Sequence, residues 1–433
     1  MTTTTRTEDL LARADATIAG GAITQFALPG GERRVLARGD GARVWDVDGR
    51  EYVDYVLGSG PLVVGHCHPR VVEAAQRQAA VGPTFYALNE PIVRLAERIV
   101  ERVPCAELVQ FSATGAEATF YALRLARAAT GRDAVLKFEG GFHGSSDYAQ
   151  MSLFPVGPPA YPAPEPTSSG IPRAIEQDVL VAPYNDLEAT RAIVEAHADR
   201  LAAIIVEPLQ RVIEPLPGFL EGLRALADRH GIVLVFDEIV TGFRLAPGGA
   251  QERYGVTPDL ATFGKIIGGG YALAAVAGRR DLLEAADHSR RGGGSTFVYI
   301  SGTLNGNPVA AAAGLATLDV LDEPGAYQRL DELGDRMRAG LERGLADAGL
   351  PGRAMGAGPM FQALVVDGPV TDYRSMRRAD AAAMRTIMHG VLEAGNLIQA
   401  EKAYLSLAHA DADVDRTLEA FAESAARYAQ AAG

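Results

Sequence analysis

The feature that most constrains the fold is a pair of short, almost wholly apolar runs in the middle of the chain. The runs "LAAIIVEP" (201–208) and "IVLVFDE" (232–238) flank "PGFLEGLRALADRHG" (217–231), whose apolar residues recur at helical spacing before a closing glycine. Strands with continuous Val and Ile are buried on both faces, and a helix between two such strands is typical of a parallel sheet covered by helices. We therefore predict an α/β fold with a mainly parallel sheet flanked by helices.

Two further stretches extend this alternation towards the N-terminus. Residues 117–131, "EATFYALRLARAATG", begin with Glu117, end in Gly131 and place their apolar residues on one broad helical face. A strand candidate, "AVLKF", follows at 134–138. Residues 144–172 are rich in Pro, Ser and Gly, and they predict a long loop of the kind that often forms a lid.

The two ends of the chain differ from the central pattern. Residues 41–56, "GARVWDVDGREYVDYV", alternate apolar and polar residues around a "VDG" turn, which predicts two short antiparallel strands. From about residue 325 the chain is rich in Arg, Glu and Asp at helical spacing, with one strand candidate at "YLSLA". Because 433 residues exceed the size at which one core usually stops growing, we expect a large domain and a smaller C-terminal one.

Composition and charge exclude several classes of protein. The net charge of -13 argues against nucleic acid as a partner, because phosphate binding needs a basic face. No apolar run reaches the about 18 residues of a membrane-spanning helix, so we expect no membrane partner. Cys67 and Cys105 are too few for a disulfide framework, and the opening "MTTTTRTEDL" lacks the apolar core of a secretory signal. These features predict a cytoplasmic protein.

Lys265 is the first candidate for chemistry. The chain has only three lysines, and this one lies in "ATFGKIIGGG" between apolar side chains and three glycines. Desolvation by such neighbours lowers the pKa of an amine, and a neutral amine is a nucleophile toward aldehydes. The alternative is a structural lysine whose stem crosses an apolar rim. Glycines favour the first interpretation because they allow a ligand to approach closely.

Asp237 ends the apolar run "IVLVFD", where ligands bind in parallel α/β sheets. A carboxylate at that point could pair with a protonated pyridine nitrogen, or it could simply cap the strand end. Its neighbour Glu238 suggests a carboxylate pair for glycoside hydrolysis. Consecutive strand residues point to opposite faces, however, so we expect the two carboxylates not to share a site.

Two turns of small residues are candidates for anion binding. Thr114, Gly115 and Ala116 in "SATGAEA" open a predicted helix, and Gly302 and Thr303 in "SGTLNGNP" precede another. Backbone N–H groups at a helix start can bind phosphate, although many helices open with Thr and Gly as a simple N-cap.

Two short motifs that contain histidine are candidates for ligand binding. The run "GHCHP" contains His66, Cys67 and His68, but no second cluster of His or Cys completes a four-ligand zinc site, so we expect no metal. In "FHG", Phe142 and His143 follow a predicted strand and could cover an aromatic cofactor. The alternative for this pair is packing in the core.

Taken in order, from about Pro29 to about His409, these features resemble the class III, fold-type I pyridoxal-phosphate aminotransferases. The resemblance rests on "LPGG", "WDVDGREYVDYV", "GHCHP", "TGAEATFYALRLARAATGRDAVLKFEGGFHG", "APYNDL", "VEP", "FDEIVTGFR", "PDLATFGKIIGGG" and "GTLNGNP". The chain looks most like the glutamate-1-semialdehyde 2,1-aminomutase branch. The resemblance implies a large pyridoxal 5'-phosphate-binding domain over 61–325, and a smaller α+β domain from 1–60 and 326–433. It also implies a homodimer with shared active sites.

The resemblance also assigns cofactor contacts. Lys265 would form the Schiff base, and Asp237 would pair with the pyridine nitrogen. Phe142, where the branch often has tyrosine, and Ile239 would cover the two ring faces. Gln210 would contact the ring hydroxyl, and the Gly302 turn would reach the phosphate of the neighbouring subunit. The full set of cofactor contacts is Thr114, Gly115, Ala116, Phe142, His143, Glu207, Gln210, Asp237, Ile239, Lys265, Gly302 and Thr303.

The predicted substrate contacts depart from that branch. Ser59 stands where the aminomutases carry tryptophan, and Ile300 stands where they carry glutamine. Arg33 or Arg34 replaces the substrate-carboxylate arginine of a longer segment, and Arg34 is the residue expected to hold a carboxylate, because "PGGERR" is similar to the arginine-bearing turn of class III β-amino-acid transaminases. Glu401 matches a glutamate that faces the substrate in the aminomutases. We therefore expect an aminotransferase that uses an amino acid donor and a small carbonyl acceptor, with β-amino acids and specialised metabolites as candidates. The alternative is an aminomutase or amino-acid epimerase with the same cofactor.

Overall fold

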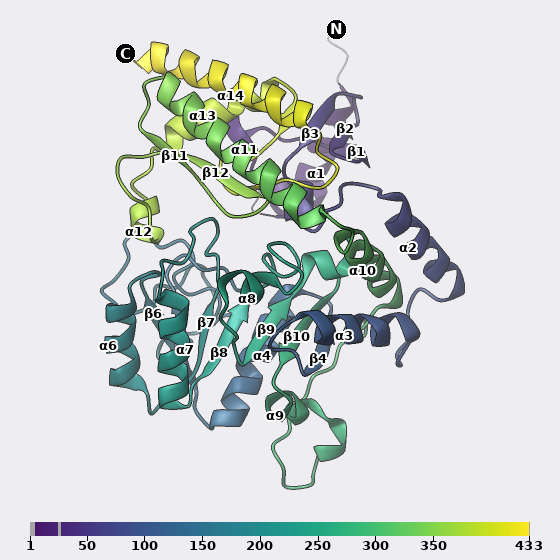
Figure 1. Cartoon of the computed structure of the whole chain (residues 1–433), viewed down its shortest axis with the longest axis vertical. Helices are drawn as coiled ribbons and strands as arrows, with labels where there is room; N and C mark the ends of the chain where they lie inside the picture. Colours follow the sequence, from purple (N-terminus) through teal and green to yellow (C-terminus); the bar gives the residue numbers. More distant parts are fainter. Residues whose placement is uncertain (1–4, 25–26, 433) are drawn as a thin grey trace. The chain divides into compact units, whose positions relative to one another are not determined.

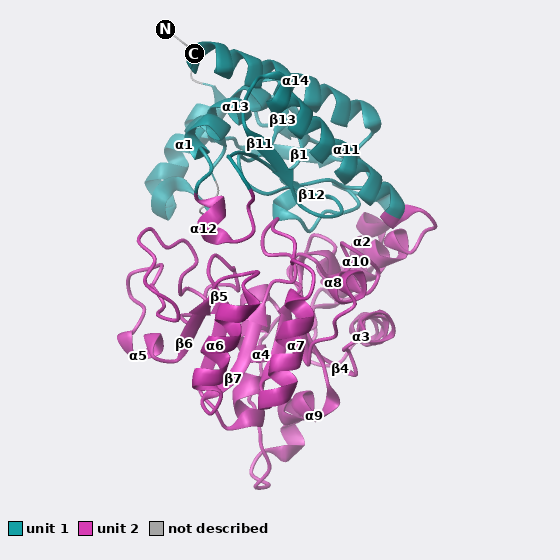
Figure 2. Ribbon diagram, turned by 60° about the vertical axis from the view of Figure 1, so that its left-hand side comes forward, with its two compact units in different colours: residues 1–69, 328–368, 378–433 teal, residues 70–327, 369–377 magenta. Residues whose placement is uncertain are grey.

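The computed structural model describes residues 5–24 and 27–432. The chain divides into two compact units (Figure 2). The first unit comprises residues 1–69, 328–368 and 378–433, and the second comprises 70–327 and 369–377. Within residues 5–24 and 27–432, no helix is both long and apolar enough to cross a membrane.

The second unit is built on a seven-stranded sheet with the strand order β4-β10-β9-β8-β7-β5-β6 (Figure 1). Neighbours from β9 to β6 run parallel, and β10 runs antiparallel to β9 and β4. The strands are β4 (Leu108–Ser112), β5 (Ala134–Phe138), β6 (Val179–Ala182), β7 (Leu201–Val206), β8 (Val233–Asp237), β9 (Leu260–Phe263) and β10 (Ala274–Gly278). The predicted α/β fold with a mainly parallel sheet is confirmed.

Alternate residues of the central strands face two different layers of helix. Ile205 and Val235 join one hydrophobic cluster with the buried side of α4 (Gly115–Thr130). Residues of the opposite parity face the other layer, where Phe138 of β5 meets Phe219 of α7 (Phe219–His230) edge-on at 5.5 Å. Burial on both faces explains why β7 and β8 contain no polar residue before Asp237.

The remaining helices of the second unit flank this sheet or the segments beside it. They are α2 (Pro69–Val81), α3 (Glu90–Arg102), α5 (Arg173–Glu176), α6 (Leu187–His197), α8 (Gly249–Tyr254), α9 (Arg280–Leu283), α10 (Pro308–Leu321) and α12 (Tyr373–Met376). Residues 144–172 form neither helix nor strand apart from one isolated bridge, as predicted for a long loop.

The first unit combines two small sheets with long helices. One sheet has the order β1-β2-β3-β13 and the other β11-β12-β14. The predicted antiparallel pair in 41–56 is confirmed, because Val44 of β2 lies opposite Tyr52 of β3. The elements are α1 (Arg6–Thr17), β1 (Leu36–Asp40), β2 (Arg43–Asp46), β3 (Glu51–Asp54), α11 (Ala326–Asp347), β11 (Gly352–Met355), β12 (Met360–Val365), α13 (Ala381–Glu393), β13 (Asn396–Leu397), β14 (Ala403–Tyr404) and α14 (Asp411–Ala432).

Candidate active site

The predicted cofactor residues of the sheet gather at one edge of the second unit. Strands β5, β7, β8 and β9 are parallel, so their carboxyl ends lie along the same edge. Phe142 and His143 follow β5, Gln210 follows β7, Asp237 ends β8, and Lys265 follows β9. Ligands of parallel α/β folds bind at this edge, so the topology favours a single site.

Asp237 and His143 form a buried pair at the centre of this edge. Nδ1 of His143 lies 2.8 Å from Oδ2 of Asp237, and the two residues are 2% and 5% exposed. The other oxygen, Oδ1, accepts hydrogen bonds from the Ile239 N–H at 3.1 Å and from the Thr262 hydroxyl at 3.2 Å. The carboxylate is therefore fixed in place on three sides. Nε2 of His143 is buried and has no hydrogen-bond partner among the described residues.

Glu238 lies in a different environment from Asp237, as strand geometry predicts. Its carboxylate accepts hydrogen bonds from the Ala250 and Gln251 N–H groups at 2.6 and 3.3 Å, and from the Thr241 hydroxyl at 3.1 Å. Complete burial raises the pKa of Glu238 to about 7. The side chain holds the start of α8, which is a structural role.

Lys265 lies two residues after the end of β9, and its backbone is strained. Its φ of 48° lies in the left-handed region that non-glycine residues rarely adopt. A Cβ added to the preceding Gly264 would lie 3.1 Å from Ile239, and one added to Gly115 would lie 2.9 Å from the same side chain. Ile239 therefore packs between the residue before Lys265 and the start of α4. Larger residues at either glycine would displace it.

The start of α4 keeps two N–H groups available for an anion. Thr114 is the N-cap and accepts the Glu117 N–H at 3.2 Å, and Glu117 in return accepts the N–H of Thr114 at 3.0 Å. This capping box uses the threonine side chain. The N–H groups of Gly115 and Ala116 have no hydrogen-bond partner within the described chain, and they point out of the positive end of the helix.

Gln210 and His143 present unpartnered atoms towards the same place. Nε2 of Gln210 donates to the Glu139 carbonyl at 2.8 Å, whereas its buried Oε1 has no partner among the described residues. A Cβ on Gly141 would lie 3.1 Å from His143 Nε2 and 3.7 Å from Gln210 Oε1. Two buried polar atoms thus converge near Gly141. Such atoms normally have partners, so they indicate that a polar ligand group belongs there.

The other predicted residues of this unit differ in exposure. The ring of Phe142 is 44% exposed, while Glu207 is buried and accepts the Arg211 N–H at 3.2 Å. Ile300 is 4% exposed and packs in the hydrophobic core. Gly302 borders a hollow of about 710 Å³, and Thr303 is exposed in the same turn.

The remaining predicted substrate residues lie in the first unit. Arg33 forms a double ion pair with Asp15 at 2.6 and 2.8 Å. Arg34 donates to the Tyr52 hydroxyl at 3.0 Å and pairs with Glu32 and Glu393. Ser59 and Glu401 are exposed. Their roles toward a substrate stay predictions.

The "GHCHP" segment has a structural explanation within the first unit. Nε2 of His66 lies 2.7 Å from Oδ2 of Asp54, and Oδ1 of the same carboxylate accepts the N–H groups of Val56 and Leu57. Among the residues that the structure describes, no group of three His, Cys, Asp or Glu side chains could hold a metal.

Two charged side chains that support the site were not predicted from the sequence. Glu139 is buried and forms a two-point ion pair with Arg374 at 2.8 and 3.0 Å, which ties 369–377 to the loop after β5. Lys137 is completely buried and donates to the carbonyls of Gly141, Ala149 and Met151. Burial lowers the pKa of Lys137 to about 7. Both fix the segment that carries Phe142 and His143.

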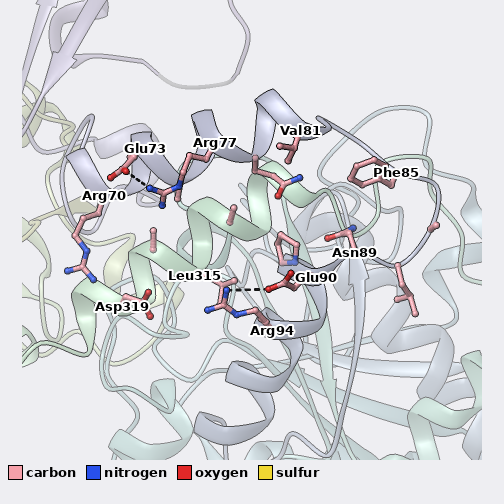
Figure 3. A pocket seen from close by; sticks show the side chains of 17 residues that line it. Arg70, Glu73, Arg77, Val81, Phe85, Asn89, Glu90, Arg94, Leu315 and Asp319 are labelled. Carbon is pink, nitrogen blue, oxygen red and sulfur yellow. Dashed lines mark hydrogen bonds and ion pairs between the residues drawn. The ribbon is translucent and has the colours of Figure 1, made fainter.

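A hollow of about 960 Å³ lies elsewhere on the second unit, between α2, α3 and α10 (Figure 3). Four of its charged side chains pair along their own helices, Glu73 with Arg77 and Glu90 with Arg94. Two others pair with residues of other segments, Arg70 with Glu323 and Asp319 with Arg98. None of the predicted cofactor residues lines it. The candidate cofactor site therefore lies at the sheet edge and not in this hollow.

Known proteins resemble this chain over almost its full length. The profile of the class-III aminotransferases matches residues 29–423. A glutamate-1-semialdehyde 2,1-aminomutase of Roseiflexus castenholzii is 43% identical over 97% of each chain. Among solved structures, an omega-transaminase from Sphaerobacter thermophilus is 36% identical with a TM-score of 0.92, covering 98% of each chain. A beta-phenylalanine aminotransferase from Variovorax paradoxus is 32% identical with a TM-score of 0.86, covering 96% of this chain and 93% of its own.

Proposed function

The chain belongs to the class-III aminotransferase family and is a pyridoxal-phosphate-dependent enzyme, and we propose that it transfers an amino group from an amino acid to a small carbonyl acceptor. The observation that carries this proposal is the buried Asp237–His143 pair at the sheet edge where Lys265 also lies. A carboxylate fixed in this way suits a pyridine nitrogen that must stay protonated.

The described residues fit the cofactor at several points. The N–H groups of Gly115 and Ala116 would bind its phosphate at the positive end of α4. Gln210 and His143 hold the two unpartnered atoms that a polar ring substituent would satisfy. Ile239 and the half-exposed Phe142 would cover the two ring faces. When bound, the cofactor supplies the electron sink that stabilises a carbanion next to nitrogen.

The protein side chains would then hold and move the protons of the reaction. Asp237 would hold a proton at the ring nitrogen, and His143 would keep the carboxylate oriented. Nζ of Lys265 would act first as a general base that removes a proton from the substrate carbon, and then as a general acid that gives the proton back. The strained backbone at Lys265 and the packing of Ile239 against Gly264 would fix the direction from which the amine approaches.

An isomerase is the second candidate, because the relative at 43% identity is named an aminomutase. The two functions differ in whether a separate acceptor is needed. We expect single amino acids to convert the cofactor-loaded protein to its aminated form, and a carbonyl acceptor to restore it, with the amino group appearing on the acceptor. Absorbance of the bound cofactor and product analysis measure both steps. Conversion of one compound into its isomer, with no acceptor, would contradict the transaminase proposal.

We also propose that the enzyme is a homodimer in which the Gly302 turn of one protomer reaches the cofactor phosphate of its partner. Large apolar side chains are exposed on the neighbouring segments, and they include Val81, Phe85, Tyr86, Leu88, Tyr299 and Leu304. Exposed apolar groups in such number favour an interface between copies. Light scattering after size exclusion should give twice the chain mass, and a monomer that retains full activity would contradict the shared site.

A further inference from the structure

Arg211 lies at the same sheet edge, directly after Gln210 in the turn that follows β7. Its guanidinium carbon is 5.6 Å from the centre of the Phe142 ring and 5.3 Å from that of Phe154. Phe154 is 51% exposed, and Arg211 itself is partly exposed. The guanidinium therefore lies within cation–π distance of two aromatic rings, one of which is the predicted cover of the cofactor.

The charge of Arg211 is not neutralised within the described residues. Its Nε donates to the Gly140 carbonyl at 3.4 Å, and no carboxylate of the described chain forms an ion pair with it. Arg374 nearby is fully paired with Glu139, and Arg34 is paired with Glu32 and Glu393. A guanidinium has five N–H donors in a planar fork, so the two terminal amino groups of Arg211 are available to a ligand.

The backbone at Arg211 is strained in a way that favours glycine. Its φ is 61°, and Gln210 and Ile213 close a tight turn around it with reciprocal hydrogen bonds at 3.0 and 2.9 Å. An arginine in the left-handed region is disfavoured relative to glycine. Residues kept in such conformations cluster at functional sites. The turn thus presents an arginine at a position where the backbone alone would select glycine.

We infer that Arg211 determines substrate specificity by binding the carboxylate of the amino donor or acceptor. The inference rests on the proposed function and names the group of the substrate that this site recognises. A planar fork matches a carboxylate at two points, and the flanking rings limit the rotation of the guanidinium. An apolar substrate body would then lie against Phe154, whose ring is exposed beside the charge.

Binding of unreactive ligands to the cofactor-loaded enzyme tests this inference without requiring turnover. Isothermal titration would compare 3-phenylpropanoate with its neutral amide on the wild type, Arg211→Gln and Arg211→Gly. We expect the wild type to prefer the acid, and both variants to bind the acid about 10- to 100-fold more weakly with little change for the amide. Arg191→Gln, an exposed arginine on α6, is the matched control and should behave as the wild type.

The glycine variant separates recognition from structure. Since the backbone at this position favours glycine, Arg211→Gly should keep or raise the melting temperature while losing affinity for the acid. Unchanged affinity for the acid in Arg211→Gln, or no preference of the wild type for the acid over the amide, would overturn the inference. A lowered melting temperature of Arg211→Gly with equal losses for both ligands would also overturn it. Failure of the transamination assay alone would count against the proposed function instead.

Discussion

Replacing Lys265 with alanine is expected to lower turnover by about 10²- to 10⁴-fold, the usual contribution of a positioned proton-transfer group. The variant loses the amine that moves the proton, while the groups proposed to hold the phosphate and the ring nitrogen remain. We therefore expect Lys265→Ala still to bind the cofactor, with an altered absorbance spectrum. Stopped-flow measurement of the amination half-reaction gives the rate directly.

The chain offers a natural control for this variant. Lys402 lies in the first unit and is the other lysine that is not completely buried. Lys402→Ala should retain the rate and the spectrum of the wild type. Wild-type turnover in Lys265→Ala would rule out the proposed proton transfer.

Replacing Asp237 with asparagine is expected to lower turnover by about 10²- to 10³-fold, comparable with the loss of one preorganised electrostatic contact. Asparagine is close in shape and still accepts a hydrogen bond, but it carries no negative charge to hold a proton on the ring nitrogen. The hydrogen bonds from Ile239 and Thr262 can be retained, so folding should change little. Steady-state kinetics and the melting temperature measure the two effects separately.

Glu238 is the matched control for Asp237, because it is the adjacent carboxylate with a different set of partners. Glu238→Gln should lower the melting temperature, since an amide cannot accept from all of the donors around α8. It should leave the spectrum of the bound cofactor unchanged. Equal effects of the two substitutions on turnover and stability would contradict the separate roles assigned to them.

The central sheet could be predicted because its strands are encoded locally. Continuous Val and Ile in β7 and β8 indicate burial on both faces, and the helix between them requires a parallel crossover. The opposite environments of Asp237 and Glu238 follow from the same strand geometry. The place of Asp237 at the end of its strand therefore predicts that it lies at the sheet edge, and strand geometry predicts that Glu238 points elsewhere.

Features that depend on distant contacts could not be predicted in this way. Glu139 and Arg374 are 235 residues apart, and nothing in the local sequence around either indicates the ion pair. The unpaired charge of Arg211 is also a property of its surroundings, because "EPLQR" does not reveal which carboxylates are absent nearby. The role of the Thr114 hydroxyl could not be predicted either. It takes part in the capping box with Glu117, so backbone N–H groups rather than this side chain remain for an anion.

The lysine that carries the cofactor can be identified directly by chemical trapping. Borohydride treatment of the pyridoxal-phosphate-loaded enzyme, followed by proteolysis and mass spectrometry, would fix the cofactor to its attachment point. We expect a pyridoxyl mass on the peptide that contains Lys265, and none on those that contain Lys137 or Lys402. Labelling of another lysine, or no labelling of the loaded protein, would contradict the assignment of the site.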